Sequence, residues 1–379
     1  MKRGLELDGV TRIVDGEMHL EDVRMRLEPG SFTVLLGRTR AGKTSLLRLL
    51  AGLDHPTSGR ILEGGADVTR VHVRSRNVAM VYQQFVNYPS LTVYENIASP
   101  LRLQKRLDKK DIDRRVRDAA ALLRLTPFLD RLPAELSGGQ QQRTAIARAL
   151  VKDAALVLLD EPLANLDYKL REELRSELRS LFQDRAAVVV YATAEPAEAL
   201  ALGGRTAVLD EGRLLQIGPA VEVYNAPATS RVGEVFSDPP MNLLAMEVTS
   251  GGQARITDDI TIPLTGHMGA LEPGKYRLGV RANHVRLTPS SEADQKLPCS
   301  VLLEEISGSE TLLYASSGPV SITAQMPGVH RHPLGARLDL FLAASRLFAF
   351  TLDGKLAAAP PGALSPSTTA PAPPLNGPN

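Results

Sequence analysis

The stretch Phe32-Thr33-Val34-Leu35-Leu36-Gly37-Arg38-Thr39-Arg40-Ala41-Gly42-Lys43-Thr44-Ser45 decides the fold of this chain. Its first five residues form an apolar run typical of a buried strand, and the next eight spell G-x-x-x-x-G-K-[ST]. A strand, a glycine-rich turn and a helix in this order form a cradle for a polyphosphate, because glycines let backbone N–H groups approach it closely. We expect Lys43 to reach the β- and γ-phosphates of ATP and the Thr44 hydroxyl to hold Mg²⁺. An ordinary strand-turn-helix is the alternative.

Composition excludes several classes of function. The chain has 379 residues, of which 44 are basic and 43 acidic, so its formal charge of +1 indicates no nucleic-acid partner. The single cysteine, Cys299, excludes an internal disulfide. The N-terminal residues lack an apolar signal segment, and no apolar run approaches the ~20 residues that span a bilayer. Any membrane role is therefore expected to be peripheral, through other subunits.

The order of apolar patterns predicts an α/β nucleotide-binding domain over residues 1–236. Strands alternate with helices, which indicates a parallel sheet, and a helical insertion interrupts them at about 90–150. Short alternating runs separated by Gly/Pro turns then predict a small all-β, OB-like barrel over 237–355. Residues 356–379 are rich in Pro, Ala, Ser and Thr, and we expect them to form a disordered tail.

Two acidic residues follow the apolar run at 156–159. At the end of a strand, Asp160 is expected to reach Mg²⁺ through water, while Glu161 is expected to polarise the water that attacks the γ-phosphate. Alone these acids would fit a simple strand end. Beside a phosphate loop they indicate ATP hydrolysis, with Glu161 as the catalytic residue.

A third motif, Ser137-Gly138-Gly139-Gln140, stands at the start of an expected helix. A serine hydroxyl, two glycine amides and a helix N-terminus form a second anion site. One phosphate loop already cradles the ATP of its own subunit. The second site therefore predicts that the triphosphate is clamped between two subunits.

Together these motifs make the chain resemble the ATP-binding subunit of an ABC transporter, over about residues 1–355. It is most similar to the carbohydrate and polyol importer branch. The resemblance implies that Gln83 touches Mg²⁺ and that residues 87–97 form the groove for a permease coupling helix. It also implies that residues 164–167 form a dimer-interface loop and that the C-terminal barrel is regulatory.

The resemblance further implies the partners and the location. We expect a second ATP-binding subunit, two transmembrane permease subunits and, indirectly, an extracytoplasmic substrate-binding protein. The chain is then peripheral on the cytoplasmic face of the bacterial inner membrane.

Three positions depart from the family pattern. Ala194 stands where a switch histidine is expected, and alanine cannot hydrogen-bond a γ-phosphate. Val14 replaces the aromatic ring that stacks on adenine, and Ala164 replaces a common serine. We therefore expect this subunit to bind ATP but to hydrolyse it less well at its own phosphate loop. A heterodimer with a sister ATPase, as in glycerol-type importers with two different ATPases, is favoured over a homodimer.

Other classes remain open. A soluble ABC ATPase outside transport would share the nucleotide motifs, but it usually carries paired nucleotide domains or a long coiled coil. An exporter subunit and a catalytically silent partner ATPase are further alternatives. The transported substrate, a sugar or glycerol by resemblance, is selected by other subunits.

Overall fold

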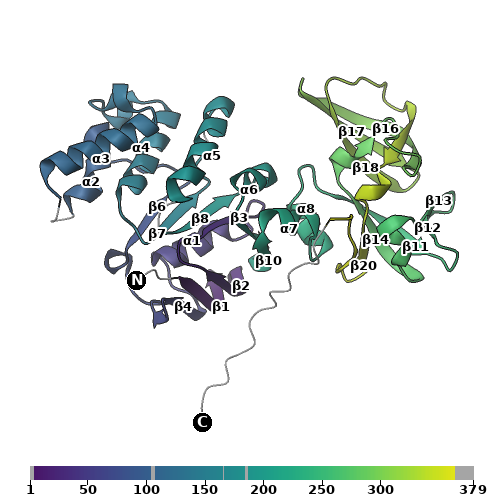
Figure 1. Ribbon diagram of the computed structural model, residues 1–379, viewed down its shortest axis with the longest axis horizontal. Coiled ribbons are helices and arrows are strands. Elements are labelled where there is room, and N and C mark those ends of the chain that lie inside the picture. The colour runs from purple at the N-terminus through teal and green to yellow at the C-terminus, as the bar shows by residue number, and fades with distance from the viewer. Residues whose placement is uncertain (1–3, 104–106, 165, 184–186, 363–379) are drawn as a thin grey trace, which may run out of the picture. The chain divides into compact units, whose positions relative to one another are not determined.

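The computed structural model describes residues 4–103, 107–164, 166–183 and 187–362. Contacts divide the chain into a first unit that ends at Ile217 and a second unit that begins at Gly218 (Figure 1). Each unit has a core of its own, as expected for a nucleotide-binding domain followed by a second domain.

The first unit contains two sheets. One has the strand order β2-β1-β4-β5, and the other has the order β10-β9-β3-β8-β7-β6. The strands are β1 (Leu5–Val14), β2 (Glu17–Leu27), β3 (Phe32–Leu36), β4 (Ser58–Glu63), β5 (Ala66–Asp67), β6 (Val78–Val81), β7 (Leu156–Asp160), β8 (Val188–Thr193), β9 (Arg205–Asp210) and β10 (Arg213–Pro219).

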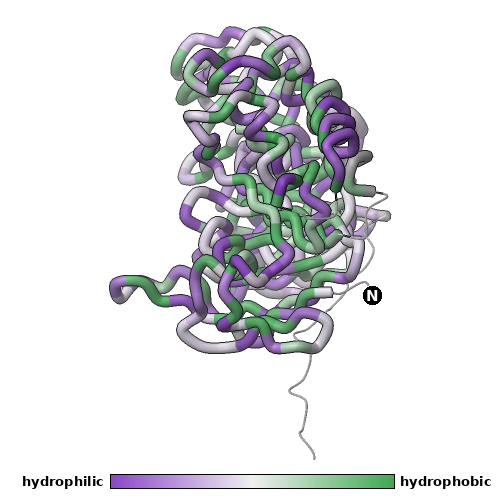
Figure 2. The backbone as a smooth tube through the Cα atoms, turned by 90° about the vertical axis from the view of Figure 1, so that its left-hand side faces the viewer, coloured by the Kyte–Doolittle hydropathy of each residue, from purple (hydrophilic) through white to green (hydrophobic). Residues whose placement is uncertain are grey.

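The six-stranded sheet carries the site. Strand β3 pairs in parallel with β8 and β9, and β7 pairs in parallel with β6 and β8. Every residue of β7 and β8 is buried, which explains why these strands read as continuous apolar runs rather than alternating ones. Hydrophobic segments accordingly mark the interior of this unit (Figure 2). The predicted parallel α/β sheet is confirmed.

The helices of the first unit include the predicted insertion. Helices α2, α3 and α4 pack on one another and form a separate helical group (Figure 1). Pro100 lies inside α2, close to its end. The helices are α1 (Lys43–Ala51), α2 (Val93–Arg102), α3 (Lys109–Leu122), α4 (Gly138–Val151), α5 (Tyr168–Gln183) and α6 (Pro196–Leu202), with 3₁₀ turns η1 (Val73–Ser75), η2 (Thr126–Phe128) and η3 (Pro133–Glu135).

The second unit is the nearly closed all-β barrel that the sequence predicts. Two antiparallel sheets, β13-β12-β11-β14-β20-β21 and β15-β19-β16-β17-β18, enclose one apolar core. The strands are β11 (Asn242–Val248), β12 (Gln253–Thr257), β13 (Ile260–Pro263), β14 (Gly274–Val280), β15 (Val285–Arg286), β16 (Gln295–Ile306), β17 (Glu310–Ser317), β18 (Val320–Pro327), β19 (Arg337–Leu342), β20 (Phe348–Thr351) and β21 (Leu356–Ala358), with 3₁₀ turns η4 (Gly266–Ala270), η5 (Ala282–His284) and η6 (Ala344–Arg346).

The unit boundary lies earlier than the predicted one at residue 236. Helices α7 (Ala220–Asn225) and α8 (Ser230–Val235) belong to the second unit. The buried guanidinium of Arg281 donates to the Tyr224 carbonyl at 2.6 Å and to the Ser237 hydroxyl at 3.1 Å. It also stacks over the Tyr224 ring at 3.7 Å. Because α7 and α8 are short, tertiary contacts of this kind, and not their sequence, decide their domain.

The barrel also extends beyond its predicted end at residue 355. Strand β21 pairs with β20 through Ala349–Ala358 and Phe350–Leu356. The expected tail therefore begins after this strand, and residues 363–379 lie outside the described residues.

Candidate nucleotide-binding site

The phosphate loop links β3 to α1 and depends on two glycines. A Cβ on Gly37 would lie 2.6 Å from the Leu209 carbonyl oxygen and 2.8 Å from the Ala41 Cβ. Gly42 caps α1 at φ +98°, a conformation that L side chains rarely adopt. The loop residues between them, Arg38 to Ala41, follow the strand directly, with Thr39 and Arg40 exposed. The predicted strand-loop-helix geometry is therefore present.

The side chain of Lys43 folds back over this loop. Its ammonium donates to the carbonyls of Gly37, at 2.7 Å, and Arg38, at 3.1 Å. It also lies 3.2 Å from the Glu161 carboxylate, and only 5% of the side chain is exposed. A buried cation is thus fixed at the mouth of a backbone cradle, where it can meet a phosphate.

Thr44 and Asp160 come together from α1 and the end of β7. The Thr44 hydroxyl lies close enough to the Asp160 carboxylate to favour its charged form. Burial raises the pKa of the Asp160 carboxyl, whereas this hydroxyl and the nearby Lys43 ammonium lower it. A hydroxyl and a carboxylate side by side are oxygen ligands of the kind Mg²⁺ prefers, so these residues fit the predicted ion.

Glu161 lies at the centre of the site. Its backbone has φ +45°, which costs about 1 kcal/mol for a non-glycine residue and is held by a hydrogen bond from its N–H to the Ala192 carbonyl. Its carboxylate accepts from the Gln83 amide at 3.1 Å. Because this bond uses the Gln83 N–H₂ group, the amide oxygen of Gln83 is left as an acceptor. The structure thus brings together Lys43, Thr44, Gln83, Asp160 and Glu161.

The β1–β2 hairpin reaches the same region. His19 Nδ1 lies 3.1 Å from the Ser45 hydroxyl, which joins β2 to the first turn of α1. Val14 is half-buried at the end of β1, opposite Glu17. Its predicted contact with adenine stays a prediction.

The position expected to hold a histidine lies beside the site. The Gly37 N–H donates to the Thr193 carbonyl at 3.2 Å, so the end of β8 lies against the phosphate loop. Ala194 follows directly and is exposed. Its methyl group offers no hydrogen bond to a phosphate or a water molecule.

The third motif forms a helix cap. The Ser137 hydroxyl accepts from the Gln140 N–H at 3.4 Å, and the Gln140 side-chain oxygen accepts from the Ser137 N–H at 3.0 Å. Ser137 and Gly138 are exposed, and a Cβ on Gly139 would meet Leu166 at 3.2 Å. Within the described residues, these four residues make no hydrogen bond to the phosphate loop. The contact of this motif with a second subunit stays a prediction.

The segment after Gln83 is tied to the helical insertion by a buried amide. Asn96 on α2 donates to the carbonyls of Tyr88, Leu91 and Thr92 and accepts from the Tyr88 N–H. The guanidinium of Arg148 on α4 stacks over the Tyr88 ring at 4.9 Å. These contacts hold the predicted permease groove against the helix that starts with the Ser137 motif.

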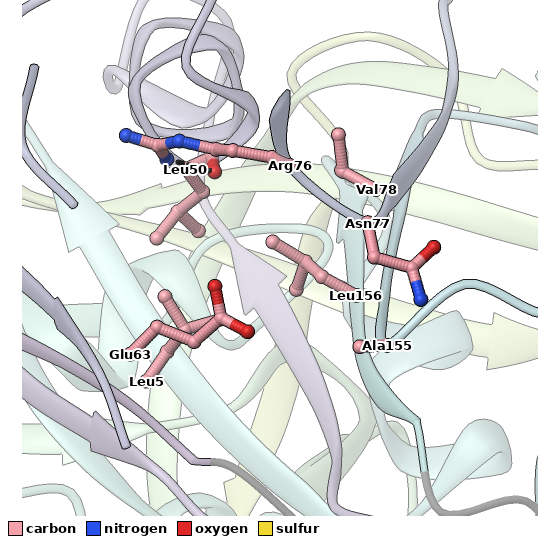
Figure 3. Close-up of a pocket in the computed structure, with 8 residues that line it drawn as sticks. All are labelled: Leu5, Leu50, Glu63, Arg76, Asn77, Val78, Ala155 and Leu156. Carbon is pink, nitrogen blue, oxygen red and sulfur yellow. Dashed lines mark hydrogen bonds between the residues drawn. The ribbon is translucent and has the colours of Figure 1, made fainter. Parts of the chain in front are cut away.

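A small hollow elsewhere in this unit has a structural role (Figure 3). It is lined by Leu5, Leu50, Glu63, Arg76, Asn77, Val78, Ala155 and Leu156. The Arg76 guanidinium donates to the Leu50 carbonyl at 2.8 Å and to the Val71 carbonyl at 2.9 Å. Arg76 therefore caps the C-terminal end of α1, opposite the phosphate loop, where a cation is favoured.

Two side chains that contact predicted site segments were missed by sequence reasoning. His19 bonds to Ser45 of the phosphate loop motif, and Arg171 bonds to the predicted interface loop. Arg171, on the helix that follows the interface loop, carries a local signal, since it is one turn beyond Asp167. His19 is a single polar residue whose partner is known only from the fold.

Two further findings concern metal sites and membranes. Within the described residues, no group of three or more His, Cys, Asp or Glu side chains is placed to hold a metal ion. A site built from a hydroxyl, an amide and one carboxylate is compatible with this result. No helix in the described ranges is both long and apolar enough to cross a membrane.

Comparisons with known proteins agree with this geometry. The family model described as ABC transporter matches residues 20–164. The sn-glycerol-3-phosphate import ATP-binding protein UgpC of Yersinia pestis is 36% identical over 354 residues, which are 93% of this chain and 98% of the relative. The protein of the same name from Escherichia coli K12 is 37% identical over the same coverage.

A solved structure supports the fold of the first unit. The ATP-binding cassette MJ0796, solved as a dimer in a post-hydrolysis state with ADP and Pi, matches with a TM-score of 0.52 and 28% identity. The match covers 57% of this chain and 98% of that one. The fold, the nucleotide chemistry and the relatives agree, and the chain belongs to the ABC transporter family as an ATP-binding, ATP-hydrolysing subunit.

Proposed function

We propose that this subunit couples ATP binding and hydrolysis to the import of a small carbohydrate or polyol, of the class to which sn-glycerol-3-phosphate belongs. The observation that carries the proposal is the convergence of Lys43, Gln83, Asp160 and Glu161 on one end of the parallel sheet. The relatives that cover nearly the whole chain are named as sn-glycerol-3-phosphate import proteins, which supports this substrate class.

In this proposal each residue has a distinct task. The loop from Gly37 to Ser45 holds the phosphates, and Lys43 neutralises their charge. Thr44, Asp160 and the amide oxygen of Gln83 would hold Mg²⁺, which neutralises charge between the β- and γ-phosphates when bound. Glu161 orients and polarises the attacking water, because its carboxylate is fixed by Gln83. Val14 would face the adenine.

The partly exposed cap from Ser137 to Gln140 supports a clamp between two subunits. Its N–H groups lie at a helix N-terminus, where an anion is favoured, yet they make no bond to the phosphate loop of the same chain within the described residues. Two ATP molecules then bind the closed dimer better than the open one, and this difference drives closure.

The partner is proposed to be a sister ATPase rather than a second copy, because Ala194 leaves this chain's own site without a hydrogen-bonding side chain. In this proposal, residues 87–97 of this subunit receive the coupling helix of one permease, and the partner ATPase receives that of the other. The subunit thus sits peripherally on the cytoplasmic face of the inner membrane and meets the extracytoplasmic binding protein only through the permeases.

Uptake measurements test the function. In proteoliposomes with the permeases, labelled sn-glycerol-3-phosphate, glycerol and maltose should be compared with and without ATP. ATP-dependent uptake of any of the three that disappears with Lys43→Ala supports import. If none of the three compounds is taken up while ATP is still hydrolysed, the subunit acts outside this substrate class.

Mixing tagged and untagged copies, with and without candidate sister ATPases, tests the dimer. Recovery of the sister subunit with the tagged chain in ATP supports the heterodimer. Recovery of self-pairs alone shows a homodimer.

A further inference from the structure

The turn after β8 lies between the phosphate loop and the predicted catalytic carboxylate. On one side the Gly37 N–H donates to the Thr193 carbonyl, and on the other the Glu161 N–H donates to the Ala192 carbonyl at 3.0 Å. Any movement of residues 192–195 therefore changes the position of Glu161 relative to the bound phosphates.

The interface loop is bonded to the backbone of Glu161. The Ala164 N–H donates to the Glu161 carbonyl at 3.3 Å, and the Leu166 N–H donates to the Leu163 carbonyl at 3.2 Å. Glu161 is thus bonded through its backbone both to the turn 192–195 and to the start of the interface loop at Ala164.

One guanidinium joins these two segments. Arg171 on α5 forms an ion pair with Glu195 at 2.8 Å. Its other terminal nitrogen donates to the carbonyls of Ala164, at 3.2 Å, and Leu166, at 3.4 Å. A planar guanidinium can bond several acceptors in fixed directions at once, which an ammonium cannot do.

The turn itself is rigid on its buried side. The Glu195 N–H donates to the Thr193 hydroxyl at 3.0 Å, and that hydroxyl donates to the Glu198 carboxylate at 2.6 Å. The Tyr191 hydroxyl donates to the same carboxylate oxygen at 3.1 Å, and Glu198 is only 4% exposed. The backbone at residues 193–195 is therefore fixed without any contribution from the side chain of Ala194.

We propose that Arg171 and Glu195 are a positioning pair that holds the turn at Ala194 against the interface loop and so sets the place of Glu161 for ATP hydrolysis. The inference rests on the proposed function, since it assumes that Glu161 orients the attacking water. Neither side chain is assigned contact with ATP.

The expected effect is on rate rather than on stability. Because 48% of the Glu195 side chain is exposed, the ion pair contributes little to folding. A catalytic group displaced by about 1 Å, however, loses roughly 100-fold in rate. Removal of the pair is therefore expected to lower kcat and to leave the phosphate loop, and hence KM for ATP, unchanged.

The test uses the full-length chain, together with the sister ATPase if one is found, and measures kcat, KM for ATP and melting temperature. Arg171→Met and Glu195→Gln should each lower kcat by about 10- to 100-fold, with KM within about twofold of wild type. The double variant should be no slower than Arg171→Met, because Arg171→Met already removes the ion pair that Glu195→Gln removes. Arg171→Lys should recover only part of the rate.

Arg175→Met is the matched control. Arg175 lies on the same helix, pairs with Glu172 at 2.5 Å and is about as buried, at 18% against 23% exposed side chain. It should keep the wild-type kcat.

Several results would overturn the inference. These are a wild-type kcat in Glu195→Gln, losses that multiply in the double variant, or a raised KM with unchanged kcat. If Arg171→Met does not fold, the exposed Glu195→Gln change still decides the matter. If wild type and Glu161→Gln hydrolyse ATP at the same background rate, both the proposed hydrolysis and this inference are refuted. A Glu161-dependent rate with unchanged pair variants refutes the inference alone.

Discussion

The ammonium of Lys43 lies 3.2 Å from the carboxylate of Glu161, so the cation of the phosphate loop and the predicted catalytic carboxylate are bonded to each other. Both groups are largely buried, with 5% and 23% of their side chains exposed. A phosphate that enters the loop competes with Glu161 for the same ammonium, because both are anions. We therefore expect ATP binding to release one of the two contacts of the Glu161 carboxylate and to leave the contact with Gln83.

Lys43→Ala should weaken ATP binding by about 10- to 150-fold, because a hydrogen bond to a charged group contributes about 1.5 to 3 kcal/mol. Titration calorimetry with ATP measures the change. Arg175→Met serves as a control for loss of a partly buried cation in the same unit. An unchanged dissociation constant would show that Lys43 does not contact the phosphates.

Glu161→Gln should lower kcat by about 100- to 10,000-fold, because an amide cannot accept the proton of the attacking water. The glutamine side chain has the same shape as glutamate and can still accept the hydrogen bond from Gln83, so ATP should still bind. With the sister ATPase present, ATP should then trap a dimer, seen as an earlier peak in size-exclusion chromatography. Monomers in ATP with normal turnover would mean that another group orients the water.

Ala194→His should raise the ATPase rate by at least about tenfold without a change in ATP affinity. The position is exposed, so an imidazole fits there, and one added donor to the γ-phosphate supplies transition-state stabilisation of this order. Steady-state kinetics of the full-length chain measures it. A rate equal to that of Ala194→Leu would show that the side chain at this position does not reach the phosphate.

Asn96→Ala should destabilise the first unit by about 2 to 4 kcal/mol, because it leaves the part-buried Tyr88 N–H and Leu91 carbonyl without their partner. Urea unfolding, with circular dichroism as the readout, measures the loss. Asn96→Asp keeps the acceptor for the Tyr88 N–H but loses the three donated bonds. At neutral pH this variant should therefore be less stable than wild type. Wild-type stability in both variants would contradict the role of this amide.

The second unit should lose stability in mild acid through His284. Burial, helped by the nearby Arg281, Arg346 and Arg286, lowers the pKa of His284 from 6.5 to about 4. Between pH 6.5 and 4 the unfolded chain binds a proton that the folded chain does not bind, so unfolding becomes more favourable as pH falls.

Melting temperatures of the full-length chain at pH 7 and pH 5 measure this effect. The transition of the second unit should fall more in wild type than in His284→Gln, whose side chain does not titrate. Equal falls in both would show that His284 is not the group responsible.

The sequence alone determined the features that depend on neighbours in the chain. The strand-loop-helix of residues 32–51 forms through local spacing, and Lys43 folds onto carbonyls only five and six residues away. The cap of Ser137 by Gln140 is also local, since the partners are three positions apart. The alternation of strands and helices predicts the parallel sheet because each βα unit is itself a local pattern.

Only the tertiary structure decided which distant groups meet. Gln83 reaches Glu161 across 78 positions of sequence, and Arg171 reaches Glu195 across 24, because β6, β7 and β8 end at the same edge of one sheet. The assignment of α7, α8 and β21 to the barrel likewise depends on contacts such as Arg281 with Tyr224. The physical reason is that periodicity and capping arise from bonds within a few residues, whereas the place of an exposed or weakly patterned segment is set by the partners that the fold brings to it.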